Sequence, residues 1–331
     1  MNDAAVVPAG DPPKAGPDVV IEVEGLSKSF GGRRVVDNLS MRVMRGQIYG
    51  FLGPNGSGKT TTIRMLCGLL TPDAGRGTCL GMDILTESRR IREHVGYMTQ
   101  RFSLYQDLSV RENLEFVARL YGVAAPEQAA GEALKRLGLE GRGKQLAGAL
   151  SGGWKQRLAL GACILPGPDL LLLDEPTAGV DPQARREFWE QIHDLAAEGL
   201  TVLVSTHYMD EAERCHEIAY IAYGKLLAQG TVQSVIAQAG LTTVTVEVTG
   251  GAGQESGRLA RDVARDLSQR PGVDMVAPFG TALHISGRDP EALESALAPF
   301  RADTRLAFRA DAPTLEDVFI DLMRRSKDDM R

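Results

Sequence analysis

The 331-residue chain has few aromatic residues, few cysteines and no excess of basic charge. Aromatic residues make up 5 %, and the four cysteines (Cys67, Cys79, Cys163 and Cys215) show no metal-ligand spacing. Reduced thiols of a cytosolic protein are therefore expected, rather than a disulfide framework or a metal site. The formal net charge of −6 argues against nucleic acid as a partner, because nucleic-acid binders carry a basic face.

Long hydrophobic runs are also missing. A membrane-spanning helix needs about 20 apolar residues in succession, and the richest window, "LALGACILPGPDLLLL", is interrupted at 166–169. The first residues, "MNDAAVVPAGDPPKAGPD", lack the basic start and apolar run of a secretory signal and predict a disordered tail over 1–18. We expect a cytosolic chain that reaches a membrane only through a partner.

The chain that follows has the pattern of an α/β domain over 19–238. The run "QIYGFL" predicts a buried strand, and a glycine-rich loop and a helical pattern follow it. Two later runs, "DLLLLDE" and "GLTVLVSTH", are typical of parallel strands buried on both faces. Residues of about 95–165 are mostly helical in pattern, with Ser109 and Glu112 forming a predicted capping box.

A change of composition near Gly240 predicts a second domain over 241–331. Its pattern reads strand, helix, two strands, helix, strand, helix, which fits a small ferredoxin-like α+β module. We interpret this module as a stabilising appendage without a ligand rather than as a sensor.

The segment "GPNGSGKT" matches the phosphate-loop motif G-x-x-x-x-G-K-[ST] and lies between a predicted strand and a predicted helix. Its glycines let backbone N–H groups turn toward phosphate, and the helix N-terminus adds partial positive charge. Lys59 supplies a full charge to the β- and γ-phosphates, and the Thr60 hydroxyl is suited to bind Mg²⁺. The predicted ATP-binding residues of this segment are Gly53, Pro54, Asn55, Gly56, Ser57, Gly58, Lys59, Thr60 and Thr61.

A second element, "LLLLDEPT", places two carboxylates at the end of an apolar strand. Ligands bind at this edge of a parallel sheet. Asp174 is predicted to face Mg²⁺, and Glu175 is suited to activate water as a general base. His207 ends the strand "TVLVSTH" at the same edge and is placed to reach the γ-phosphate. Gln100 follows "VGYMT", another predicted strand, and can contact Mg²⁺ or the attacking water.

The segment "LSGGWKQRLAL" contains a second set of small, donor-rich residues, 151–153, directly before a helix. A simple N-cap would explain Ser151, but Gly152 and Gly153 lower helix stability. We interpret the segment as a second anion site that completes the nucleotide pocket of another copy of the domain. Two chains arranged head-to-tail about a two-fold axis would each lend this element to the other.

The motif set resembles the nucleotide-binding subunit of an ABC transporter over about residues 19–235. The phosphate loop, "LSGG", "LLLLDEPT", "AGVD" and "STH" occur in the order of that family. The resemblance implies a P-loop NTPase with a RecA-like core, an N-terminal antiparallel β part and a helical insertion. It also implies that Phe30 stacks on adenine, that Gln100 touches Mg²⁺ and faces the membrane partner, and that Asp181 links the two active sites of a dimer.

Two motifs differ from the sequences that are usual in the family. Trp154 stands where Gln commonly follows "LSGG", and "AGVD" replaces "SALD" while keeping Asp181. Contact of Ser151 with the γ-phosphate is still expected, whereas the role of the fifth signature position is open.

The segments "GYMTQRFSLYQDLSVRENLEF" and "PTLEDVFIDL" are similar to segments of the ATPase subunits of drug and antibiotic exporters whose permease is a separate chain. The resemblance implies an ATPase at the cytoplasmic face of the inner membrane that uses ATP and Mg²⁺, forms a homodimer and drives export of a drug-like or lipid-like molecule. Two alternatives stay open: a non-transport ATPase of the same superfamily, and an importer subunit.

Overall fold

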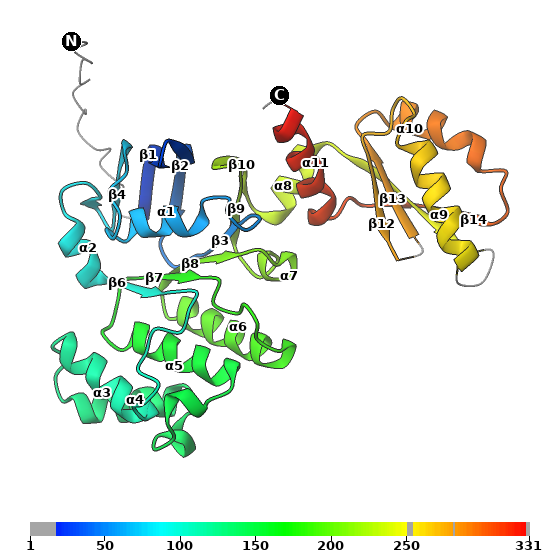
Figure 1. Ribbon diagram of the computed structural model, residues 1–331. Helices are drawn as coiled ribbons and strands as arrows, with labels where there is room; N and C mark the ends of the chain where they lie inside the picture. The colour runs from blue at the N-terminus through cyan, green and yellow to red at the C-terminus, as the bar shows by residue number, and fades with distance from the viewer. Residues whose placement is uncertain (1–17, 250–253, 281, 329–331) are drawn as a thin grey trace, which may run out of the picture. The chain divides into compact units, whose positions relative to one another are not determined.

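The computed structural model describes residues 18–249, 254–280 and 282–328. Except for Asp18, the predicted tail lies outside these residues. The chain divides into two compact units between Ala228 and Gln229, and each unit is described here by itself (Figure 1). The division precedes the predicted boundary at 238–241, and helix α8 (Val232–Ala239) falls in the second unit, where it contacts α11 (Leu315–Asp328).

The first unit begins with a four-stranded sheet in the order β2-β1-β4-β5. Its pairings are antiparallel. The strands are β1 (Val19–Phe30), β2 (Arg33–Met44), β4 (Ala74–Cys79) and β5 (Met82–Asp83). This is the antiparallel part that the resemblance predicted near the N-terminus.

The second sheet has six strands in the order β10-β9-β3-β8-β7-β6, and the division between the units falls within its edge strand β10. The pairs from β9 through β3, β8 and β7 to β6 are parallel. The strands are β3 (Ile48–Leu52), β6 (Val95–Met98), β7 (Leu170–Asp174), β8 (Thr201–Thr206), β9 (Glu217–Ala222) and β10 (Lys225–Gly230). Every residue of β3, β7 and β8 is buried, as their uninterrupted apolar runs predicted.

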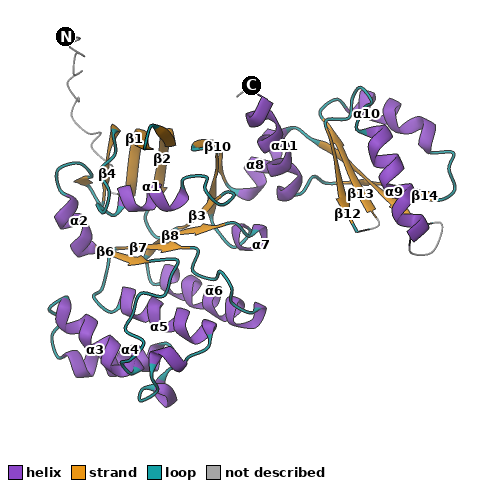
Figure 2. Ribbon diagram, in the orientation of Figure 1, coloured by secondary structure: helices purple, strands orange, loops and turns teal. Residues whose placement is uncertain are grey.

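Both faces of the six-stranded sheet are covered. Leu170 and Leu172 of β7 join a core with α1 (Lys59–Leu66) and the first sheet, whereas Leu171 and Leu173 join a core with α6 (Pro182–Ala197). Figure 2 shows the resulting layers, with α1 on one side of the sheet and α5 (Gly152–Ile164) and α6 on the other. The short helices α2 (Ser88–His94) and α7 (Met209–Ala212) lie in connections between strands.

A helical part with its own core lies between β6 and β7. It contains α3 (Val110–Leu120), α4 (Pro126–Arg136), the 3₁₀ turns η1 (Glu140–Arg142) and η2 (Ala147–Ala149), and α5. The predicted capping box at the start of α3 is confirmed: Ser109 accepts from the backbone of Glu112, and Glu112 accepts from the backbone of Ser109.

The second unit contains a four-stranded antiparallel sheet in the order β12-β13-β11-β14. Its elements are β11 (Thr242–Val248), α9 (Gln254–Leu267), β12 (Met275–Phe279), β13 (Ala282–Gly287), α10 (Pro290–Leu297), η3 (Ala298–Phe300), β14 (Leu306–Asp311) and α11. This is the predicted order of elements, and the strand order is that of a ferredoxin-like sheet. Val244 and Val246 of β11 pack in its core with α9 and α10.

Candidate nucleotide-binding site

The sheet order brings four sequence-distant loops together. The neighbouring parallel strands β3, β8, β7 and β6 end just before Gly53, His207, Glu175 and Gln100, respectively. Since the carboxyl ends of parallel strands share one edge of a sheet, these loops lie side by side there. Strand order along the sheet, which the sequence does not give, therefore explains why residues so far apart in the chain form one site.

The phosphate loop leads from β3 into α1 and needs its glycines. Gly56 and Gly58 have φ angles of 79° and 107°, and residues with a side chain rarely adopt such values. Lys59 is 4 % exposed, and its ammonium donates to the carbonyl of Gly53 at 2.7 Å and of Pro54 at 3.2 Å. Burial lowers the pKa of Lys59, and the charge of Glu175 opposes that shift.

Thr60 and Asp174 form the oxygen-rich part of the site. The Thr60 hydroxyl donates to both carboxylate oxygens of Asp174, at 2.8 and 3.0 Å, and the Ser205 hydroxyl donates to the same carboxylate at 2.7 Å. Asp174 is only 2 % exposed, so these donors compensate for its burial. One carboxylate and one hydroxyl suit Mg²⁺, which binds to few protein oxygens and otherwise to phosphates and water.

Glu175 is the centre of the site. Its Oε1 lies 3.2 Å from the Lys59 ammonium, and its Oε2 accepts from the Gln100 amide at 3.1 Å and lies 3.2 Å from Nδ1 of His207. The backbone of Glu175 has a φ of 48°, an uncommon left-handed conformation for a residue with a side chain. Strain of this kind concentrates at functional sites. The Ser205 hydroxyl accepts from the N–H of Glu175 at 3.0 Å and so holds this conformation.

A cavity of about 210 Å³ opens at this edge. Its lining includes Asn55, Gly56, Gly58, Lys59, Thr60, Thr61, Gln100 and Glu175. The structure thus brings together most of the phosphate loop with two residues from other strands. Of the described residues that line the cavity, none belongs to 151–153, and Asp181 is not among them.

Residues 151–153 and Asp181 form a separate group. Ser151 lies at the N-cap of α5 and is exposed, but its hydroxyl makes no capping bond to that helix. A cap confined to its own helix therefore does not explain the serine. Gly153 has a packing reason: a β-carbon there would lie 2.5 Å from that of Ala184 in α6. Asp181 caps α6 through the N–H groups of residues 183 and 184.

Phe30, the predicted adenine-stacking residue, lies at the end of β1 and is 50 % exposed. Core packing, the commoner fate of phenylalanine, therefore does not account for it. The structure gives the ring one charged neighbour, the Lys28 ammonium at 5.8 Å from its centroid.

Sequence reasoning missed the polar residues beneath the site. Glu211 is fully buried and accepts from the hydroxyls of Thr177 and Thr206, while Arg185 lies 3.5 Å from its carboxylate. Thr177 follows Glu175 by two residues, and Thr206 directly precedes His207. Glu211 therefore ties together the two loops that carry these side chains. Nothing in the charged run "MDEAER" distinguishes it, and the signal that could have led to it is the pair of polar residues, Ser205 and Thr206, at the end of an apolar strand.

The fold and the site define an ATPase of the P-loop class. The phosphate loop lies between a strand and a helix, and an acidic pair lies at the end of a nearby strand. The chain belongs to the ABC transporter family as an ATP-binding subunit. The family model described as "ABC transporter" matches residues 36–178, and the match assigns ATP binding and ATP hydrolysis to this domain.

Relatives across bacteria agree with that assignment. The chain is 38 % identical over 310 residues to the Nod factor export ATP-binding protein I of Rhizobium sp. (strain N33), covering 93 % of this chain and 98 % of the relative. It is 46 % identical over 225 residues to the probable multidrug ABC transporter ATP-binding protein YbhF of Escherichia coli (strain K12). That match covers 67 % of this chain but only 39 % of YbhF, so the chain corresponds to less than half of that protein's length.

Solved structures share the fold of the first unit. A structure titled as the ATP-binding subunit of an ABC transporter has a TM-score of 0.61 at 30 % identity, covering 67 % of this chain and 93 % of that one. The ATP-binding cassette MJ0796, in a dimeric post-hydrolysis state bound to ADP and Pi, has a TM-score of 0.59 at 25 % identity, covering 64 % and 98 %. The predicted fold class of the first unit and the predicted family are confirmed.

Proposed function

We propose that this chain is the ATPase subunit of an exporter, which hydrolyses ATP with Mg²⁺ and drives a drug-like or lipid-like molecule through a separate membrane permease. The observation that carries the proposal is the convergence of Lys59, Gln100 and His207 on the Glu175 carboxylate beside the phosphate loop. The printed names of the relatives, which refer to multidrug transport and Nod factor export, support the direction of transport.

In the proposed reaction, Glu175 takes a proton from the water that attacks the γ-phosphate. Its burial and its contacts with His207 and Gln100 hold the carboxylate at the cavity, which general-base catalysis requires. Lys59 and the N–H groups of residues 56–61 hold the phosphates, and His207 stabilises charge near the γ-phosphate. Phe30, half exposed at the end of β1, stacks on the adenine.

Thr60, Asp174 and Gln100 would hold Mg²⁺. The Thr60 hydroxyl and the Asp174 carboxylate already lie within hydrogen-bond distance, and both offer hard oxygen ligands. The ion would neutralise charge on the β- and γ-phosphates. The hydroxyl of Ser205 donates to Oδ1 of Asp174 and so helps to orient the carboxylate.

A second copy of the chain would complete the site. Ser151, Gly152, Gly153 and Asp181 do not line the cavity of their own chain, and the Ser151 hydroxyl is free of capping bonds. In a head-to-tail homodimer this exposed group meets the γ-phosphate held by the partner copy. The dimeric state of MJ0796 is consistent with such an arrangement. ATP then joins the two copies, and hydrolysis releases them.

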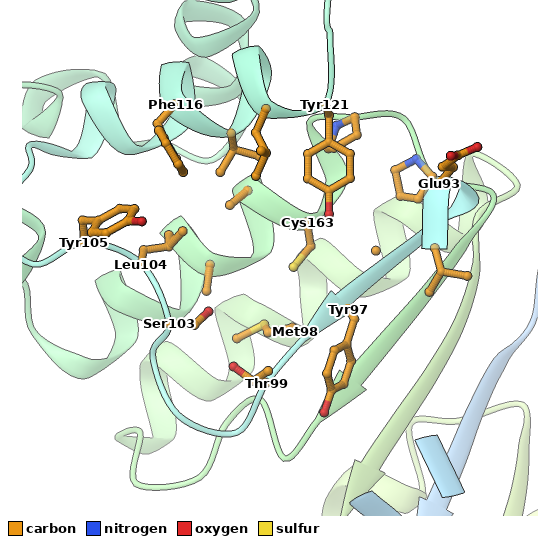
Figure 3. A pocket seen from close by; sticks show the side chains of 18 of the residues that line it. Glu93, Tyr97, Met98, Thr99, Ser103, Leu104, Tyr105, Phe116, Tyr121 and Cys163 are labelled. Atoms are coloured by element: carbon orange, nitrogen blue, oxygen red, sulfur yellow. The ribbon is translucent and has the colours of Figure 1, made fainter. Parts of the chain in front are cut away.

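The permease would bind in a groove beside the site. A cavity of about 300 Å³ lies between β6, α3 and α5, and aromatic side chains line it: Tyr97, Tyr105, Phe116 and Tyr121 (Figure 3). Phe116 and Tyr121 are 39 % and 51 % exposed. Exposed aromatic clusters of this kind mark protein interaction sites. Thr99 and Arg101 also line the groove, so an occupant contacts the same loop that carries Gln100.

This arrangement would place the subunit at the cytoplasmic face of the inner membrane, held there by the permease. The described ranges contain no helix that is long and apolar enough to cross a bilayer. Residues Glu93 and Arg101 at the groove supply charges that can orient a permease loop.

Purification of the chain from membranes tests the proposal. We expect it to retain an integral membrane protein with several spans, and ATP hydrolysis to rise when that protein and its transported molecule are present. The variant Phe116→Asp should lose the membrane protein, because a charge would be buried among the aromatic side chains of the groove. Leu69→Asp is the matched control, since Leu69 is 53 % exposed and lies outside the groove. Equal retention by both variants would reject the groove as the docking site.

A further inference from the structure

Trp154 stands at the motif position where the family usually has Gln. It has two charged neighbours in the helical part of the first unit. The guanidinium of Arg142 lies over its ring at 4.4 Å from the centroid, and that of Arg157 at 4.9 Å. The indole is half-buried against the core formed by α3, α4 and α5. Among aromatic rings, that of tryptophan attracts cations most strongly. It can therefore hold both arginines next to the start of α5.

Arg157 extends this contact to α6. Its guanidinium is paired with Glu187 and also donates to the carbonyl of Leu137 at 3.3 Å. Glu187 accepts from the side-chain amide of Gln183 at 3.1 Å, and the backbone N–H of Gln183 donates to the Asp181 carboxylate at 3.1 Å. A continuous set of contacts thus runs from Trp154 to Asp181.

Arg142 extends the contact in the other direction. It donates to the side-chain carbonyl of Gln145 at 3.0 Å, and the Gln145 amide donates to the carbonyl of Ala149 at 3.1 Å. Ala149 precedes Ser151 by two residues. Trp154 follows Ser151 by three, so the loop that carries Ser151 is held from both sides.

Close packing supports the same link. Gly153 lies against Ala184, at the start of α6, with no room for a β-carbon, and the position of a β-carbon on Gly152 lies 3.8 Å from the carbonyl of Gly179. The start of α5 and the start of α6 are therefore in contact. These are the two places from which Ser151 and Asp181 project.

We propose that Trp154 is a positioning residue for ATP hydrolysis, which through Arg157 and Glu187 keeps Ser151 and Asp181 in one fixed arrangement. The inference rests on the proposed function, in which both residues reach the active site of the partner copy. If they must meet that site together, a misplacement of ~1 Å can cost about a hundred-fold in rate. The ring of Trp154 contacts two guanidinium groups at once, and an amide has no ring face with which to replace these contacts.

Steady-state hydrolysis by the full chain tests the inference. We expect Trp154→Gln and Glu187→Gln each to lower kcat about ten-fold, with ATP affinity unchanged, because the phosphate loop of the same chain is untouched. Trp154→Phe should retain most of the activity, since a phenyl ring still attracts cations. The double variant should be no slower than the slower single one, as expected for residues that act through one link.

Glu198→Gln is the matched control. Glu198 pairs with Arg136 and also joins the helical part to α6, but at the opposite end of that helix. Its kcat should equal that of the original chain. The inference is overturned if Trp154→Gln keeps its kcat, if it loses ATP affinity, or if Glu198→Gln is as slow as Glu187→Gln.

A mixture of variants separates this inference from the proposed function. Lys59→Ala chains mixed with Ser151→Arg chains should recover activity if sites are shared, and Lys59→Ala mixed with Trp154→Gln should recover as much or more. Failure of the first mixture contradicts the shared site itself. Recovery in the first mixture but not in the second contradicts only the role of Trp154.

Discussion

The Lys59 ammonium lies 3.2 Å from Oε1 of Glu175, and the two side chains are 4 % and 8 % exposed. The residue proposed to hold phosphate is thus paired with the residue proposed to activate water. Phosphate oxygens would compete with Glu175 for the ammonium, because both are anionic. We infer that binding of ATP weakens this pair and frees the carboxylate for the attacking water.

Replacement of the proposed base tests its role. Glu175→Gln should lower hydrolysis by about 10² to 10⁴-fold, since general-base catalysis contributes that much. ATP affinity should be kept, because Lys59 and the phosphate loop are unchanged and the carboxylate that competes with phosphate for the ammonium is gone. Chains that bind ATP without hydrolysing it should accumulate as dimers in gel filtration. Unchanged turnover would reject Glu175 as the base.

The lowered pKa of Lys59 predicts how ATP binding depends on pH. Burial shifts this pKa below its usual value of 10.5, so the ammonium loses its charge at a lower pH than an exposed lysine does. Affinity for ATP should therefore fall as the pH is raised through the alkaline range. Glu175 raises the pKa of Lys59, so in Glu175→Gln the fall should begin at lower pH.

Equilibrium binding of ATP at a series of pH values between about 8 and 10 measures this, because the pKa of Lys59 is lowered from its usual value. Ser151→Arg serves as the control, since Ser151 does not line the cavity that holds Lys59. A pH profile that is the same in the original chain and in Glu175→Gln would contradict the predicted coupling.

Removal of one charge beneath the site tests the buried network. Glu211→Gln replaces a carboxylate that accepts from two threonine hydroxyls, and the Thr206 oxygen already accepts from the N–H of Tyr208. The amide of Gln has only one oxygen, so one hydroxyl would lose its acceptor. A buried donor without an acceptor lowers the free energy of unfolding by about 1–3 kcal/mol. We expect lower kcat as well, because the loops of Glu175 and His207 lose their common support.

Denaturant unfolding and steady-state kinetics measure both effects. Glu213→Gln is the matched control, since Glu213 is a nearby glutamate that is exposed. If the two variants behave alike, Glu211 has no special role in the site.

The strands and the phosphate loop could be predicted from sequence because each has a local cause. Uninterrupted apolar runs gave β3, β7 and β8, and a carboxylate, a histidine or a glutamine at a strand end pointed to one edge of the sheet. In the structure, Lys59, Gln100 and His207 each contact the carboxylate of Glu175.

The residues that escaped prediction depend on tertiary contacts. Burial of Glu211 follows from the packing of α7 against β3 and from its contacts with Thr177 and Thr206, and the local sequence does not differ from that of an exposed charged helix. Two glycines in 151–153 suggested an anion site, yet Gly153 is also required by Ala184, thirty-one residues later in the chain. Trp154 could not be interpreted without Arg142 and Arg157 in place.

The shared site can be tested with two variants, one altered in the phosphate loop and the other at Ser151. Ser151→Arg should abolish turnover while leaving ATP binding by the single chain intact, because it blocks the partner's site rather than its own. Mixed with Lys59→Ala chains, it should recover about one working site in each mixed dimer. The hydrolysis rate measured across mixing ratios should therefore pass through a maximum. Mixtures that are as inactive as the two separate variants would indicate that each chain works alone.

Dilution of the purified chain tests the central claim most directly, since that claim requires two copies for every turnover. The rate of ATP hydrolysis per chain should fall steeply as the concentration drops below the dissociation constant of the ATP-bound pair. A rate per chain that stays constant over several decades of dilution, down to concentrations at which light scattering detects only monomers, would contradict it.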